Sequence, residues 1–245
     1  MFKNRYKFKP IVSIISLILI LHFMLNNNCI ITAFYEKEDL SKTYNIVYSG
    51  SRNEKNIALT FDDGPHPIYT EEILDILKEY NVKATFFILG KHGEEYPDIL
   101  HRQNIEGHEL GIHSYNHINL KNQEENVIRE EFSRTQDIIR KVTGKKSKLF
   151  RPPYGIYNQV IYDIVSENGG NMVLWTYYQD TKDWGNPGVE KIIEIVLSQA
   201  RNGDIILFHD HNEAKENQVI GALKIIIPEL LNRGYKFVTI SELLK

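Results

Sequence analysis

Short apolar runs alternate with amphipathic stretches along most of this chain, from residue 56 to the C-terminus. The apolar runs predict buried strands at 57–61, 84–89, 107–112, 148–150, 171–175, 204–208 and 235–238. Helical spacing of apolar residues predicts helices at 73–80, in the stretch up to 102, and at 123–142, 157–167, 188–200 and 217–232. The stretch 123–142 is the clearest helix, because apolar residues occupy one face, charged residues the other, and Gly144 suits its C-terminal end.

Strands that alternate with helices at this spacing predict a parallel sheet in an α/β fold. Seven such strands can close into a barrel. The chain has 245 residues, and no repeat or linker-like stretch divides residues 56–245. We therefore expect one domain over 56–245, preceded by an N-terminal appendage.

The first 35 residues have the layout of an export segment. An apolar run at 11–25 follows four basic residues, Lys3, Arg5, Lys7 and Lys9. Fifteen residues are fewer than the roughly 20 that a membrane span needs. No charge occurs between residues 10 and 35, however, so both a signal peptide and a membrane anchor stay open for 1–35. The basic flank predicts that the body lies outside the cytoplasm, anchored at the outer membrane face or secreted, with 36–55 as a tether.

Charge and cysteine content exclude several classes of protein. The formal net charge is −3, and the basic N-terminus makes the remaining body more acidic than that. An acidic body argues against nucleic-acid binding, which needs a basic face. Cys29 is the single cysteine, so an internal disulfide and a cysteine metal cage are both excluded. We expect a monomer.

An Asp-Asp pair and two histidines carry the clearest chemical signal. Asp62 and Asp63 end the first predicted strand, and His113 and His117 follow the third. One carboxylate and two imidazoles make a three-ligand site for a divalent metal, with a position left open as a catalytic metal requires. His113 and His117 are four residues apart, a spacing that can place both rings on one face of a helical turn. The aspartate of the pair that does not bind the metal is then a candidate general base.

Other chemically reactive residues also follow predicted strands. Arg151 follows the fourth strand, Asp180 and Asp183 the fifth, and His209 the sixth. The carboxyl ends of barrel strands share one face, where active sites are built. Core histidines scattered at random would not show that pattern.

Five segments resemble, in order and spacing, the five motifs of the polysaccharide deacetylases, also called the NodB-homology domain or carbohydrate esterase family 4. The segments are Thr60–Pro65, His113–His117, Arg151–Gly155, Asp180–Trp184 and Leu207–His209. The resemblance covers about residues 55–245. It implies a distorted β/α barrel that hydrolyses N- or O-acetyl groups of glycans with zinc or a similar divalent metal. The ligand types also suit cobalt and nickel.

The resemblance also implies roles for individual residues. Asp63, His113 and His117 correspond to the metal ligands, and water activated by the metal is the nucleophile. Asp62 corresponds to the general base and His209 to the general acid for the leaving amine. Asp183 would pair with His209 and keep it charged. Arg151 would hold Asp62 through a charge-assisted hydrogen bond.

Substrate contacts are implied at four positions. Pro152 and Pro153 would hold Tyr154 rigidly, so that its backbone N–H helps the metal to stabilise the oxyanion. Tyr154 and Trp184 would stack on sugar rings, and Pro153 and Leu207 complete the expected substrate-binding set. Asp210 and His211 are assigned structural or rim positions. The remaining histidines receive no catalytic role: His66, His92, His101 and His108.

Three other functions compete with an N-deacetylase. A zincin-type metallopeptidase is disfavoured, because His108 and His113 are one residue too far apart and Gly107 and Gly111 disfavour a helix. A non-catalytic glycan-binding module would not need the complete set of catalytic residues. An O-deacetylase acting on xylan would use the same chemistry on an ester.

The substrate is the least determined part of the function. Export favours peptidoglycan as the substrate of such a deacetylase, with N-acetylglucosamine as the sugar that loses its acetyl group. Family members that act on muramic residues differ in part at the first motif, which also favours glucosamine here. Chitooligosaccharides, exopolysaccharide and spore cortex are the alternatives.

Overall fold

A computed structural model describes residues 44–211 and 217–245. The predicted signal or anchor at 1–35 lies outside these residues, as does the first part of the predicted tether, 36–43. Within the described ranges, no helix combines the length and apolar character that crossing a bilayer requires.

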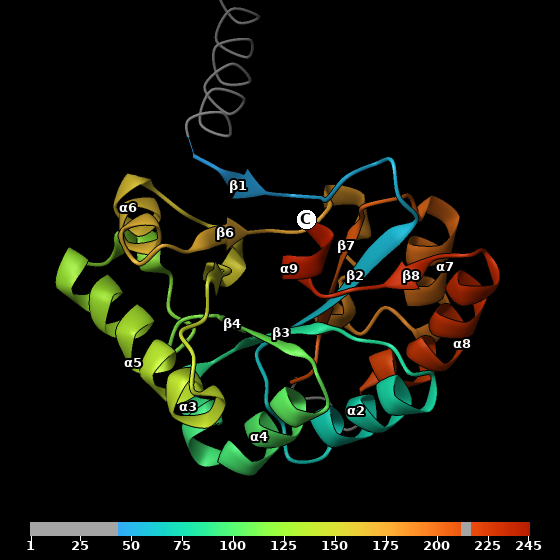
Figure 1. Ribbon diagram of the computed structural model, residues 1–245, viewed down its shortest axis with the longest axis horizontal. Coiled ribbons are helices and arrows are strands. Elements are labelled where there is room, and N and C mark those ends of the chain that lie inside the picture. The colour runs from blue at the N-terminus through green and yellow to red at the C-terminus, as the bar shows by residue number, and fades with distance from the viewer. Residues whose placement is uncertain (1–43, 212–216) are drawn as a thin grey trace, which may run out of the picture. The chain divides into compact units, whose positions relative to one another are not determined.

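One parallel sheet forms the centre of the fold (Figure 1). All seven predicted strands are present: β2 (Asn56–Asp62), β3 (Thr85–Ile88), β4 (Glu109–Ile112), β5 (Leu149–Phe150), β6 (Asn171–Val173), β7 (Ile205–His209) and β8 (Lys236–Phe237). The strand order is β1-β6-β5-β4-β3-β2-β7, with β8 paired to β2. The predicted parallel α/β fold is confirmed.

The barrel is distorted where its two ends meet. β6 and β7 are not paired as strands; single bridges join Ser49 to Asp204 and Asp180 to Leu207. The backbone N–H of Thr176 adds a hydrogen bond of 3.1 Å to the carbonyl of Ile205. Irregular backbone therefore closes this side, which leaves room there for the cavity described below.

A short strand lies inside the segment that was predicted as a tether. β1 (Ile46–Val47) pairs in parallel with β6, and Arg52 forms an ion pair with the buried Asp204. The compact unit that contains the sheet thus begins at Ile46, before Asn56. Two residues are too few to produce a recognisable alternation in a polar segment, so the sequence pattern did not reveal β1.

Helices surround the outer face of the sheet in Figure 1. They are α2 (Tyr69–Glu79), α3 (Gly90–Glu95), α4 (Pro97–Ile105), α5 (Glu125–Thr143), α6 (Gln159–Glu167), α7 (Val189–Gln199) and α8 (Gln218–Asn232). α5 ends as predicted, because Gly144 adopts a left-handed φ of 73° at its C-cap.

Two apolar cores lie on the two faces of the sheet. The larger packs the outer faces of the strands against the helices, and includes Phe61, Phe86 and Phe208. The smaller includes Ala58 and Phe87, with Ile240 of the short helix α9 (Ile240–Leu243) packed among them. Successive side chains of a strand point to opposite faces. Asp62 therefore lies on the same face as Ala58, inside the barrel.

Candidate active site

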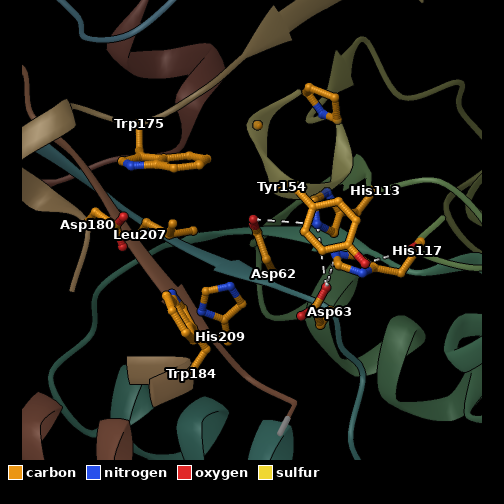
Figure 2. Close-up of a pocket in the computed structure, with 12 residues that line it drawn as sticks. Asp62, Asp63, His113, His117, Tyr154, Trp175, Asp180, Trp184, Leu207 and His209 are labelled. Atoms are coloured by element: carbon orange, nitrogen blue, oxygen red, sulfur yellow. Dashed lines mark hydrogen bonds and ion pairs between the residues drawn. The ribbon is translucent and has the colours of Figure 1, made fainter. Parts of the chain in front are cut away.

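A cavity of about 450 Å³ opens at the carboxyl ends of the strands (Figure 2). Its lining consists of Asp62, Asp63, His113, His117, Pro152, Tyr154, Gly155, Trp175, Asp180, Trp184, Leu207 and His209. Most of the residues singled out from the sequence thus meet in one place. Pro153, which was expected to contact substrate, is buried and is not part of this lining, whereas Pro152 is.

Asp63, His113 and His117 converge at one side of the cavity, and Figure 2 shows their polar ends facing one another. Oδ1 of Asp63 lies 3.5 Å from Nε2 of His113 and 3.4 Å from Nε2 of His117. The three ligand atoms lie within 4.8 Å of one another. Oδ1 is also buried and has no hydrogen-bond partner among the residues that the structure describes. A buried acceptor left unpaired beside two imidazole nitrogens fits a cation.

The protonation of the two imidazoles also suits metal binding. Nδ1 of His113 lies 2.7 Å from the carbonyl oxygen of Arg151, which can only accept, so Nδ1 carries the proton and the lone pair is on Nε2. Burial lowers the pKa of both His113 and His117, which favours the neutral form that binds metals. Burial also raises the pKa of Asp63, because it disfavours the charged form of the carboxylate.

The segment that carries the two histidines is a loop, so the helical turn that their spacing allows does not form. β4 ends at Ile112, and both Ser114 (φ 64°) and His117 (φ 61°) adopt left-handed conformations. Glu131 of α5 holds this loop by accepting hydrogen bonds of 2.8 Å from the backbone N–H groups of Tyr115 and Asn116. Sequence reasoning missed Glu131. An acidic residue on the apolar face of α5 was the available signal.

Arg151 lies inside the barrel and binds Asp62. Its guanidinium is fully buried and donates to Oδ1 of Asp62 at 2.7 Å and to the hydroxyl of Thr60 at 2.9 Å. The carbonyls of Val173 and Leu174 accept its other hydrogen bonds. Burial lowers the pKa of Arg151, and the charge of Asp62 opposes that effect. With Oδ1 occupied, Oδ2 of Asp62 is the oxygen that lies toward the metal ligands, 3.7 Å from Nε2 of His113.

His209 lies at the end of β7, the strand that pairs with β2. Its Nδ1 lies 2.8 Å from Oδ1 of Asp183, and its backbone N–H donates to Oδ2 of the same carboxylate at 2.7 Å. Burial lowers the pKa of His209, but the hydrogen bond and charge of Asp183 outweigh burial and raise the pKa to about 9. At neutral pH the imidazole is therefore protonated, with Nε2 as its second N–H donor.

Aromatic residues form the rim and one wall of the cavity. Tyr154 and Trp184 are about three-fifths exposed, at 60% and 61%, which leaves their rings accessible to a ligand. Trp175 forms a wall above the cavity in Figure 2. A side chain at Gly155 would come within 2.9 Å of the Trp175 ring, so only glycine allows this packing. Sequence reasoning did not assign Trp175 to the site, although its place at the end of a predicted strand was a usable signal.

Comparisons with known proteins agree on one family. The model of the family described as polysaccharide deacetylase matches residues 49–173. A peptidoglycan-N-acetylglucosamine deacetylase of Bacillus cereus is 40% identical over 209 residues, which cover 85% of this chain and 97% of the relative.

Solved structures extend the comparison to the fold. The peptidoglycan N-acetylglucosamine deacetylase Bc1960 superposes with a TM-score of 0.79 at 36% identity, over 83% of this chain and 94% of that chain. A family 4 acetyl xylan esterase from Clostridium thermocellum, solved with a cobalt ion, gives a TM-score of 0.71 at 36% identity, over 76% and 89% of the two chains.

Proposed function

This chain belongs to the polysaccharide deacetylase family, and from that membership we propose that it removes the acetyl group of N-acetylglucosamine in peptidoglycan. One observation carries the proposal: a single cavity brings together a metal-ligand set, a carboxylate held by a buried arginine, and a protonated histidine. Those are the groups that hydrolysis of an amide requires.

Asp63, His113 and His117 would hold the divalent metal. When bound, the metal would lower the pKa of a water molecule and polarise the acetyl carbonyl. We propose zinc, because carboxylate and imidazole ligands suit it, with cobalt or nickel as the alternatives. The cobalt ion in the esterase structure supports a site tolerant of several metals.

Asp62 would be the general base. Arg151 binds its Oδ1 at 2.7 Å and fixes the direction of the carboxylate, so Oδ2 is the atom that takes the proton of the attacking water. Arg151 makes its hydrogen bonds inside the barrel, away from the cavity opening, and acts on the reaction through Asp62. Asp62 also pairs in register with His209 across β2 and β7, so base and acid stand on adjacent strands.

His209 would be the general acid. Nε2 would donate its proton to the nitrogen of the departing glucosamine, because an amine leaves the tetrahedral intermediate only once it is protonated. Asp183 would keep the imidazole charged until that transfer. The backbone N–H of Tyr154 would stabilise the oxyanion. Trp184 and Tyr154 would stack on sugar rings, and Leu207 would supply an apolar wall.

An N-terminal export segment supports the choice of peptidoglycan. Residues 1–35 carry the basic and apolar pattern of a signal or anchor, and an exported enzyme meets the cell wall. We propose that the protein acts outside the cytoplasm as a monomer. The second candidate substrate is acetylated xylan, which the esterase structure favours.

Mass spectrometry of digested cell walls tests the substrate. Purified full-length protein, loaded with zinc, is incubated with peptidoglycan, N-acetylglucosamine oligomers and acetylated xylan in parallel, with Asp62→Asn protein as the inactive control. We expect muropeptides that have lost the acetyl group of glucosamine while muramic acid keeps its own. Acetate release from xylan alone would contradict the proposal and favour the esterase.

A further inference from the structure

The peptide bond between Asp63 and Gly64 is held on both sides by side chains. Nδ1 of His92 lies 2.7 Å from the carbonyl oxygen of Asp63. The N–H of Gly64 donates to Oδ1 of Asp210 at 3.0 Å. Asp63 itself has a φ of 76°, in the left-handed region that residues with a side chain rarely adopt. Such a conformation persists only where the surroundings impose it.

Asp210 joins the end of β7 to this peptide. The carboxylate is fully buried, and its second oxygen accepts a hydrogen bond of 2.7 Å from the hydroxyl of Thr70. Its backbone N–H donates to the carbonyl of Asp62 at 3.2 Å. A Cβ atom at Gly64 would lie 2.1 Å from Oδ2 of Asp210, so only glycine lets the carboxylate come this close.

His92 lies in the short helix α3 and approaches the carbonyl oxygen of Asp63 from there. A carbonyl oxygen can only accept, so Nδ1 of His92 carries the proton. The ring of His211 stacks on His92 with centroids 4.2 Å apart and planes within 13°, which restrains the orientation of the donor. The residue after Asp210 thus supports the hydrogen bond that His92 makes.

We propose that His92 and Asp210 are positioning residues that fix the Asp63–Gly64 peptide and thereby aim the Asp63 carboxylate at the metal. This inference rests on the proposed function, in which Asp63 is a metal ligand. If the hydrogen bond of His92 or that of Asp210 is lost, the Asp63–Gly64 peptide is less restrained and φ of Asp63 can relax. Oδ1 would then leave its place between His113 and His117. The same two residues were given no functional role from the sequence.

Zinc affinity of the metal-free full-length protein tests the proposal without measuring catalysis. The dissociation constant is determined by competition with a chromogenic chelator. His92→Phe keeps a ring to stack on His211 but loses the donor, whereas His92→Asn loses the ring and keeps an N–H near the position of Nδ1. We expect zinc binding about 10–100-fold weaker in His92→Phe, the loss typical of a lost outer partner, and near wild type in His92→Asn.

Asp210 is tested against a matched carboxylate at the other end of the same strand. Asp204 directly precedes β7, is equally buried, and accepts hydrogen bonds from Tyr178, Gln179 and the backbone N–H of Arg201. We expect Asp210→Ala to weaken zinc binding about 10–100-fold and Asp210→Asn to restore most of it. Asp204→Ala should lower the melting temperature and leave zinc affinity unchanged.

The outcomes separate failure of the proposed positioning role from failure of the proposed metal site. Wild-type zinc affinity in His92→Phe and Asp210→Ala would overturn the positioning role. Equal weakening in His92→Phe and His92→Asn would overturn the role of the His92 hydrogen bond. If circular dichroism shows that Asp210→Ala does not fold, the comparison of His92→Phe with His92→Asn tests the proposal alone, because His92 is only half-buried. Failure of the wild-type protein to bind zinc would overturn the proposed metal site together with this inference.

Discussion

Replacing Asp183 by asparagine should move the alkaline limit of deacetylation to lower pH. In the wild-type protein the carboxylate of Asp183 raises the pKa of His209 to about 9, against the effect of burial. The asparagine removes the charge but leaves burial in place. Asp62 and Asp63 also raise this pKa, with smaller effects, and remain in place, so the pKa of His209 should fall toward its ordinary value of 6.5.

The size of the effect follows from the two pKa values. At pH 8, a group with a pKa of about 9 is roughly nine-tenths protonated, and one with a pKa of about 6.5 only about 3%. The proposed acid works only while protonated, so activity is present below its pKa and lost as pH rises through it. We expect Asp183→Asn to lose up to about 30-fold in activity at pH 8 relative to its own acidic maximum.

Amide and ester substrates separate proton donation from other effects of the substitution. The assay is the pH dependence of kcat/KM on an N-acetylglucosamine oligomer and on an aryl acetate, whose phenolate leaves without a proton. The alkaline limit of activity should move to lower pH with the amide substrate only. Thr181→Val is the control, because the hydroxyl of Thr181 also contacts Oδ1 of Asp183 at 3.1 Å but carries no charge. An alkaline limit of the amide reaction that stays at the wild-type pH in Asp183→Asn would refute the reasoning.

Three further outcomes are expected. Chelation should abolish deacetylation, and added Zn²⁺ or Co²⁺ should restore it. Elemental analysis should find little metal in His117→Ala. Full activity of that variant in metal-free form would contradict the ligand set. Asp62→Asn should keep the metal and the contact with Arg151 but lose about 10²–10⁴-fold in rate, the usual size of general-base catalysis, so wild-type activity would remove Asp62 from the mechanism. Protease added to intact cells should digest residues 56–245, whereas protection together with cytosolic fractionation would contradict export.

The strands and the metal-ligand set were accessible from the sequence because both depend on local patterns. A strand buried on two faces is a continuous apolar run, as in β2 and β7, and its position does not depend on its neighbours. Chemically reactive residues directly after such runs then lie at one face in any parallel barrel. The convergence of Asp63, His113 and His117 follows from that rule.

Features that depend on contacts between distant segments were not accessible in this way. The spacing of His113 and His117 is compatible with a helix, but the loop between them is fixed by Glu131 of α5. The functional interest of His92 and Asp210 becomes visible only when both meet one peptide bond. In each case the partner lies more than ten residues away in the chain, so no local pattern records it.

The apolar core and the catalytic residues depend on the same strand register. Phe61 stacks on Phe86 and Phe208 outside the barrel, with ring centroids 5.0 and 5.6 Å apart. One residue further along, Asp62 pairs with His209 inside it. A slip of one residue would turn every side chain of a strand to the other face. The aromatic packing that opposes such a slip therefore also holds the proposed base and acid on the same side of the sheet, facing one cavity.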